Sequence, residues 1–594
     1  MFSNTTGSNN IGLGYSALSN NNADNNTAVG YGVMGANTTG TSNVAVGGLA
    51  LDANTTGNNH VALGYEALSS NTTAHNNTGL GRSALRNNTT GYSNTGVGGG
   101  ASQNNTTGIN NVAVGYLALD TSTTGNQNTA VGSIALDANT SGHSGTAIGY
   151  GALSAATTAN NNTAIGAVSM HNTTSGGNNC ALGYAAMYEN QTGANNTALG
   201  YASMYFNTAS NNTAVGYYAM NANTSGTSNT AVGRQALEDN TTSSSNTAVG
   251  DMCLSSNTGG HSNTGIGANS LQSNTSGVAN CAVGQSALQN NTSGSYNMAI
   301  GHDSLLSNTG GQQNVAMGDF TLRLNQTGSY NTGLGASALS ANTGSNNTGV
   351  GYSVLVAHTT GAHNTAIGSD ALEDNTSASH CVAVGSHALA NNTTADGNTA
   401  VGGNALKNVT TGVSNVAIGR EAGDTIVTGA DNTYLGRHAD ASANNVSYEV
   451  AVGSNVTGIG SNTCRIRADN GVYHTKNTTT FETTSDQRIK KNIVDNNSGL
   501  DILNKIQVRN FEYKTSDEIT KDSPELKDVV GSAVIEKEGV QLGVIAQELE
   551  KILPESVNVQ STGIKTVDTD NLTWYLINAI KELSTKVAAL EAVH

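Results

Sequence analysis

The segment NNTAVGYYAMNANTSGTS (residues 211–228) contains one complete unit of a repeat that fills most of this chain. When the sequence is aligned on the glycine of its AVG-like triplets, that glycine recurs every 17 residues from Gly14 to Gly453. Three of the steps are shorter by a single residue, and these steps end at Gly30, Gly216 and Gly351. A unit of this length cannot bury its apolar side alone. The period therefore predicts a solenoid of stacked coils, one coil for each unit.

Each position of the unit has its own chemistry. The residue before the glycine is aliphatic, and the residue four after it is usually Leu or Met, so we expect both to face the core. The residue directly after the glycine can be Tyr, Arg or Asp, which are rarely buried. We therefore expect the chain to turn a corner at the glycine, which has no Cβ, between two short strands. The aliphatic residues predicted inside include Val46, Leu63, Val114 and Val215.

The remainder of the unit is rich in Asn, Thr, Ser and Gly, and a frequent form is NTTG. Asn and Gly tolerate the left-handed backbone conformations of tight turns. We expect these turns on the outside of the coil, where stacked Asn side chains can form hydrogen-bonded ladders from one coil to the next.

Charge and composition exclude several classes of protein. The net charge is −17, which argues against nucleic acid as a partner. No apolar run approaches the roughly 18 residues that would span a membrane, so we expect no membrane insertion. The five cysteines are scattered and the 13 histidines show no metal-ligand spacing. We therefore predict no metal site and no cofactor.

The repeat resembles the head repeats of trimeric autotransporter adhesins, which carry a similar core triplet at a shorter period. The resemblance covers roughly residues 5–460 and implies a parallel β-roll in which three chains pack side by side. A monomeric β-solenoid is the alternative. We assign residues 1–460 to this shaft and residues 461–484 to a connecting segment.

The composition changes near residue 460. Of the 23 Lys and Arg residues, 16 lie after it, as do both prolines and the only Trp. Residues 539–557 predict a strand followed by an amphipathic helix that ends at Pro554. The end of the chain predicts a second strand and a long helix, whose apolar residues follow a spacing of 4, 3, 4 and 3. That spacing predicts a coiled-coil seam for self-association, with packing on its own domain as the alternative. The seam consists of Leu576, Ile580, Leu583, Val587 and Leu590.

Three motifs in this region are SDQRIKKNI (residues 485–493), GVIAQELE (543–550) and LTWYLINAIKEL (572–583). Together they resemble the intramolecular chaperone auto-processing domain that ends many phage tail fibres, tail spikes and endosialidases. The family usually has Leu where Ile489 stands. We assign residues 485–594 to this domain.

The resemblance implies that the domain trimerises the chains, guides folding of the shaft and then cuts itself off between Thr484 and Ser485. Ser485 matches the nucleophile of the family, and Lys490 matches its partner in a Ser–Lys dyad. A lysine serves as a base when its pKa is lowered, and Arg488 and Lys491 are the cations nearby. Helix capping by Ser485 is the alternative. Single-turnover self-cleavage is the only catalysis predicted, and the shaft is not expected to be an enzyme.

These features predict a homotrimeric fibre of a tailed phage or similar particle that binds a host surface receptor, with a glycan as one candidate. We expect it in the virion after assembly in the host cytoplasm. The first coil starts almost at Met1, so we expect a tail or baseplate attachment protein at the N-terminus, unless the chain is a fragment. The alternatives are a bacterial cell-surface trimeric adhesin and a polysaccharide-degrading tail spike.

Overall fold

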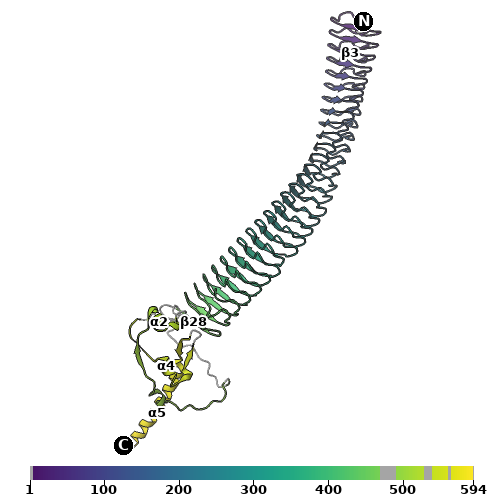
Figure 1. Ribbon diagram of the computed structural model, residues 1–594. Coiled ribbons are helices and arrows are strands. Elements are labelled where there is room, and N and C mark those ends of the chain that lie inside the picture. Colours follow the sequence, from purple (N-terminus) through teal and green to yellow (C-terminus); the bar gives the residue numbers. More distant parts are fainter. Residues whose placement is uncertain (1–3, 468–487, 489, 527–537, 560–562, 593–594) are drawn as a thin grey trace. The chain divides into compact units, whose positions relative to one another are not determined.

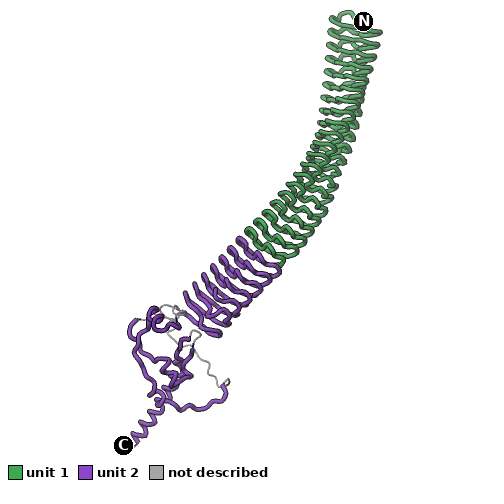
Figure 2. The backbone as a smooth tube through the Cα atoms, in the orientation of Figure 1, with its two compact units in different colours: residues 1–346 green, residues 347–594 purple. Residues whose placement is uncertain are grey.

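The computed structural model describes residues 4–467, 488, 490–526, 538–559 and 563–592. The chain divides into two compact units, residues 1–346 and 347–594 (Figure 2), and each is described by itself. Unit 1 consists of stacked coils, and unit 2 contains further coils followed by an α+β region (Figure 1). The protein is thus mainly β, a parallel β-solenoid followed by a small α+β region, as predicted.

Each coil contributes one strand of three residues. The strands of unit 1 are β1 (Ile11–Leu13), β2 (Thr27–Val29), β3 (Val44–Val46), β4 (Val61–Leu63), β5 (Thr78–Leu80), β6 (Thr95–Val97), β7 (Val112–Val114), β8 (Thr129–Val131), β9 (Thr146–Ile148), β10 (Thr163–Ile165), β11 (Cys180–Leu182), β12 (Thr197–Leu199), β13 (Thr213–Val215), β14 (Thr230–Val232), β15 (Thr247–Val249), β16 (Thr264–Ile266), β17 (Cys281–Val283), β18 (Met298–Ile300), β19 (Val315–Met317) and β20 (Thr332–Leu334). Those of unit 2 are β21 (Thr348–Val350), β22 (Thr365–Ile367), β23 (Val382–Val384), β24 (Thr399–Val401), β25 (Val416–Ile418), β26 (Thr433–Leu435), β27 (Val450–Val452) and β28 (Cys464–Ile466).

Within each unit, a strand pairs in parallel with the strand of the next coil. Thr213 lies opposite Thr230, and Val215 lies opposite Val232, so equivalent residues of the repeat meet. The shorter steps keep this pairing, because Thr197 still lies opposite Thr213 although the connection between them is one residue shorter than usual. One repeat therefore forms one coil, which confirms the prediction from the period.

The glycine after each strand forms the predicted corner. Gly250 has a φ of 144°, in a region that residues with a Cβ rarely adopt. A Cβ on Gly250 would also lie 2.4 Å from the carbonyl oxygen of Gly267, the glycine of the next coil. Glycine is therefore required twice, by its own backbone angle and by the glycine stacked on it.

The predicted direction of the aliphatic residue before the glycine is wrong. The middle residue of the strand is the buried one, and Ala45, Ala62 and Ala214 are each 0% exposed. Val46 and Leu63 are instead 37% and 40% exposed, and the equivalent residues Val114 and Val215 are only half-buried. Because side chains alternate along a strand, an inward alanine turns both of its neighbours outward.

The prediction that Leu or Met four after the glycine points inward is confirmed, but the second strand is absent from the described coils. Met220 and Leu254 are fully buried, and they lie in turns with φ near 52°. This left-handed conformation is unusual for a bulky residue. It is held by backbone hydrogen bonds between coils, such as the N–H of Met220 to the carbonyl of Ala236 (2.9 Å).

The predicted Asn ladders exist on both sides of the coil wall. Exposed pairs bond on the surface, as Nδ2 of Asn161 does to Oδ1 of Asn178 (3.2 Å), but the ladder of the NTTG-like turn lies inside. Asn257 is fully buried, and its Nδ2 donates to Oδ1 of Asn240 (3.1 Å) and to the carbonyl of Gly260 (2.8 Å). Nδ2 of Asn274 in turn donates to Oδ1 of Asn257 (2.8 Å). Thr258, the next residue of the same turn, is exposed. The turn is thus half inside, contrary to the prediction.

A second Asn column precedes the strands. Asn212 and Asn229 are buried, and the N–H of Asn229 donates to Oδ1 of Asn212 (2.9 Å). His60 occupies this column in one coil, and burial lowers its pKa to about 4. The ring is therefore neutral at pH 7 and accepts the N–H of Asn77 at Nδ1 (3.2 Å). The core of the shaft is consequently part apolar and part amide.

The core changes in the last coils of unit 2. Ile426 occupies the place of a ladder Asn, and Tyr434 occupies the place of the strand alanine; both are fully buried. Gly423 makes room for Tyr434, because a Cβ there would lie 2.7 Å from Cδ2 of the tyrosine. The hydroxyl of Tyr434 donates to the buried carboxylate of Glu449 (3.2 Å), which also accepts the N–H of Gly460 (2.7 Å).

The α+β region contains short elements and one long helix. Its strands form two antiparallel pairs, β29 with β30 and β31 with β32. The strand and the helix predicted over residues 539–557 are present, but the α-helix ends at Leu549 and not at Pro554, which instead begins a 3₁₀ helix. The second strand and the long helix are also present. In chain order the elements are α1 (Leu500–Leu503), β29 (Arg509–Phe511), α2 (Ser516–Asp522), the 3₁₀ helix η2 (Pro524–Leu526), β30 (Gln541–Gly543), α4 (Ala546–Leu549), the 3₁₀ helix η3 (Pro554–Ser556), β31 (Val557–Val559), β32 (Lys565–Val567) and α5 (Thr569–Glu591).

The Asn ladder yields a stability prediction. Asn257→Ala removes three hydrogen bonds and leaves the buried amide groups of its neighbours without their partner, which costs about 1–3 kcal/mol for each group that loses its partner. Because stability in a repeat array is local, we expect faster amide hydrogen exchange in the coils around residue 257. Thr258→Ala, which changes an exposed side chain of the same turn, is the control. Equal exchange in the two variants would contradict a structural role for the ladder.

Candidate functional site

The predicted cleavage site lies at the edge of what the structure describes. Thr484, Ser485 and Ile489 lie outside the described residues, so the Ser–Lys dyad stays a prediction. The three cations of the motif, Arg488, Lys490 and Lys491, have exposed side chains. In the single chain, the side chain of Lys490 is therefore in contact with solvent.

The GVIAQELE motif extends from the last residue of β30 through α4. Leu549 and the nearby Leu553 are among the few large apolar side chains buried in the described part of the α+β region. Arg509 on β29 holds α4 through a two-pronged contact with Glu548, with Nε–Oε2 and Nη2–Oε1 distances of 3.1 and 3.0 Å. Lys565 on β32 pairs with Glu550. The motif thus supplies one of the buried leucines and two acids that form ion pairs with β29 and β32.

Helix α5 uses one face to hold the start of the domain. Nδ2 of Asn578 donates to the carbonyl of Asn496 (2.6 Å), and Glu582 accepts the N–H of Leu500 (3.3 Å). Ala579 is buried against Gly499, where a Cβ would lie 2.4 Å from the nitrogen of Ala579. Residue 582 lies four residues after 578 and three after 579, so all three lie on one side of the helix. The alternative of packing on its own domain is therefore realised on this face.

The predicted seam lies on the other side of α5 and is open. Its five residues are between 45% and 69% exposed in the single chain, and Trp574 is 65% exposed. An apolar stripe of this kind is normally covered by a partner surface. The structure confirms the helix on which the seam was predicted, while its association with other chains stays a prediction. The exposed seam consists of Leu576, Ile580, Leu583, Val587 and Leu590.

A second open apolar surface follows the strands of the coils in each unit. We call it the strand stripe, and it consists of the first and third residues of β1–β28. The third residue is Val, Ile, Leu or Met in every one of these strands, and the first is Thr, Val, Ile, Cys or Met. No charged or amide side chain interrupts these positions. This surface was not predicted, because the hydrophobicity of these aliphatic residues favours a place inside the coil.

Other site chemistries find no support among the described residues. In the described parts of the chain, no group of three or more His, Cys, Asp or Glu side chains is placed to hold a metal ion. The helices that the structure describes include none that is both long and apolar enough to cross a membrane.

Comparison with known proteins identifies the C-terminal motifs. Residues 485–558 match the family model described as chaperone of endosialidase. A search of curated proteins found no match to the chain. The matched segment begins at the serine of the SDQRIKKNI motif and includes α4 and its surroundings. The long β-solenoid together with the chaperone-of-endosialidase domain supports a protein of the tail-fibre and endosialidase type.

Proposed function

We propose that this protein is a homotrimeric fibre of a tailed phage or similar particle, and that it binds a host surface receptor. Its C-terminal domain trimerises the chains, guides folding of the shaft and cleaves itself off between Thr484 and Ser485. The match of residues 485–558 to the chaperone of endosialidase is the observation that carries this proposal. The fibre resides in the virion, and an attachment protein joins its N-terminal end to the tail or baseplate.

The strand stripe supports trimerisation of the shaft. A sheet face that stays in water normally carries polar side chains, whereas the stripe carries an aliphatic residue in every strand from β1 to β28. Exposed apolar patches beyond a few hundred Å² mark interaction surfaces. Because the stripe repeats with the coil, a second copy of the chain presents the same spacing and matches it rung for rung. Three chains with their stripes turned inward would cover it.

The open seam of α5 supports the same assembly at the other end of the chain. Leu583 and Val587 lie on the helix face opposite Asn578 and Glu582, which hold the helix to its own domain. The helix can therefore join a coiled coil without losing those contacts.

A chaperone domain solves a physical problem of this shaft. Every coil resembles its neighbours, so three chains that associate at random can pair out of register by a whole coil at little cost. Parallel strands that form non-local contacts also fold slowly. A C-terminal trimer aligns the three chains before the coils form. Removal of that domain afterwards makes the assembled shaft kinetically stable, because the unfolded chains cannot realign.

The proposed cleavage is an attack of a hydroxyl on the preceding peptide bond. Oγ of Ser485 attacks the carbonyl carbon of Thr484, the C–N bond breaks, and the proton of the hydroxyl passes through Lys490 to the leaving amine. Water then hydrolyses the resulting ester. Lys490 is exposed in the single chain, so the desolvation that lowers the pKa of a lysine would come from a neighbouring chain. On this proposal, cleavage waits until the trimer has formed.

Trimerisation can be tested by light scattering. The intact chain of 60.0 kDa should give about three times that mass before cleavage, and a monodisperse monomer at micromolar concentration would refute the proposal. Ile266→Asp combined with Ile300→Asp places charges in the strand stripe, so we expect the trimer to dissociate at lower temperature. The control combines Thr258→Asp with Thr292→Asp, two exposed turn positions of the same coils, and should behave as wild type.

Self-cleavage can be tested on a denaturing gel. The 594-residue chain should yield a 484-residue shaft and a 110-residue fragment that begins at Ser485. Ser485→Ala should abolish cleavage while the trimer still forms. Lys490→Ala should slow it by about 10²–10⁴-fold, because a general base contributes that much, and Lys491→Ala should slow it less. Ser498→Ala, at an exposed serine of the same domain, is the control. An intact wild-type chain in a folded trimer would refute self-cleavage and leave the domain as a permanent cap.

A further inference from the structure

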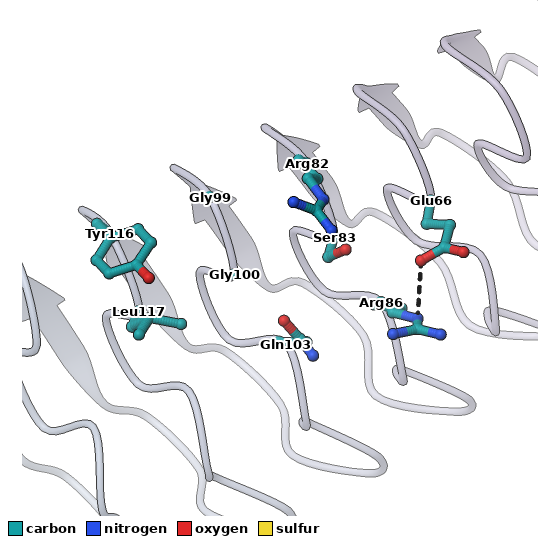
Figure 3. Close-up of a pocket in the computed structure, with 9 residues that line it drawn as sticks. All are labelled: Glu66, Arg82, Ser83, Arg86, Gly99, Gly100, Gln103, Tyr116 and Leu117. Carbon is teal, nitrogen blue, oxygen red and sulfur yellow. Dashed lines mark ion pairs between the residues drawn. The ribbon is translucent and has the colours of Figure 1, made fainter.

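A coil that breaks the pattern of the array offers a surface that the regular coils do not have, and such a coil is a candidate for specific recognition. One such break is a run of three glycines, where Gly99 and Gly100 follow the corner glycine Gly98 (Figure 3). In the coil before, the two positions after the corner carry Arg82 and Ser83; in the coil after, they carry Tyr116 and Leu117. The middle coil therefore lacks two side chains that its neighbours possess. The resulting cavity of about 280 Å³, which we call the notch, is lined by these residues and by Glu66, Arg86 and Gln103.

The side of the notch formed by Tyr116 is an uncovered aromatic ring. Elsewhere, tyrosines at the same position of consecutive coils stack on each other, as Tyr184, Tyr201 and Tyr217 do with centroid distances of 5.2 and 5.4 Å. Gly99 offers no ring to stack on Tyr116, and Tyr116 is 63% exposed. Coils lie about 4.8 Å apart, so Tyr116 and Arg82 are separated by two coils, or roughly 9.6 Å. That gap holds one flat ring in contact with both sides.

The opposite side of the notch is cationic. Only seven Lys or Arg residues precede residue 460, and two of them, Arg82 and Arg86, line this cavity. Nε of Arg86 pairs with Glu66 at 3.1 Å. The side chain of Arg82 has no hydrogen-bond or ion-pair partner among the residues that the structure describes. In a chain of net charge −17, an arginine that faces a cavity without its own acid is a binding feature that calls for an anion.

We propose that the notch binds a uronic-acid residue of a surface polysaccharide, that is, a pyranose ring that carries a carboxylate. The ring packs on the face of Tyr116 in the space that a side chain of residue 99 would fill. The carboxylate pairs with the guanidinium of Arg82, and sugar hydroxyls bond Gln103 and Arg86. This inference rests on the proposed host-surface function and names the chemistry of the receptor. A nucleic acid is disfavoured by the overall negative charge.

The test measures binding of oligogalacturonate and oligomannuronate to the full chain by calorimetry. Gly99→Tyr fills the notch with the same ring that the next coil carries at this position, as Tyr116. The substitution fits, because the backbone of Gly99 is not left-handed and its Cβ would lie 3.7 Å from Cδ2 of Tyr116. Gly48→Tyr is the matched control, because Gly48 occupies the same position of another coil, also beside a tyrosine. We expect Gly99→Tyr to abolish binding and Gly48→Tyr to leave it unchanged.

Charge recognition has its own control. Arg82→Gln should weaken binding about 10- to 100-fold, the equivalent of one charge-assisted hydrogen bond. Arg234→Gln changes the same position of another coil, where the arginine pairs with Asp251 (2.8 Å), and should have no effect. Methyl-esterified oligogalacturonate, which keeps the ring and loses the charge, should bind as weakly to wild type as the acid binds to Arg82→Gln.

Three results would overturn the notch as a uronic-acid site. The first is that neither oligouronate binds to wild type. The second is that polyglutamate binds to wild type as tightly as the oligouronates do. The third is that Gly99→Tyr and Gly48→Tyr lose the same amount of oligouronate binding. Adsorption of the wild-type fibre to host cells is measured separately. Adsorption without oligouronate binding would overturn the notch and retain the proposed function, whereas oligouronate binding without adsorption would overturn the proposed function alone.

Discussion

The close contact between corner glycines is the constraint on which the shaft depends. In coil after coil, a Cβ on one corner glycine would clash with the backbone of the next, as it would between Gly233 and the carbonyl oxygen of Gly250 (2.2 Å). This contact sets the distance between coils to that of paired strands. At that distance the strands pair in register, the turn segments exchange backbone hydrogen bonds, and the amides of the Asn columns reach each other. A side chain in place of a corner glycine would push two coils apart, and this would weaken the strand pairing, the backbone hydrogen bonds and the amide contacts together.

So short a coil encloses little space, and this determines which residues are buried inside it and which are left on its surface. In the regular coils the interior is filled by alanine from the strand, by a small residue (such as Ala219) and the Leu or Met that follows it in the turn segment, and by two Asn side chains. Buried amides are stable there because each is hydrogen-bonded to the coil above or below. The larger aliphatic residues are left on the surface as the strand stripe. An ordinary domain buries such residues in its own core, whereas this chain presents them to a partner.

The sequence alone determined the period, the single coil for each repeat, the glycine corner, the existence of Asn ladders and the change to an α+β domain whose motifs match a known family. These properties follow from local chemistry repeated many times, because spacing and residue type are enough to read them. The pairing of Ser485 with Lys490 came from the resemblance to that family and stays a prediction, because Ser485 lies outside the described residues.

Only the tertiary structure decided which way side chains face. Val46 was predicted inside by its hydrophobicity, but the narrow interior accepts Ala45 instead, and alternation along the strand then turns the larger residue outward. Asn257 was predicted outside by its polarity, yet stacking supplies the hydrogen bonds that allow its burial. Arg82 and Tyr116, which lie two repeats apart in the sequence, become two sides of one cavity only because the coils stack. The direction of a side chain depends on the volume available inside the coil, and the residues that it meets depend on the neighbouring coil. Neither is a property of the local sequence.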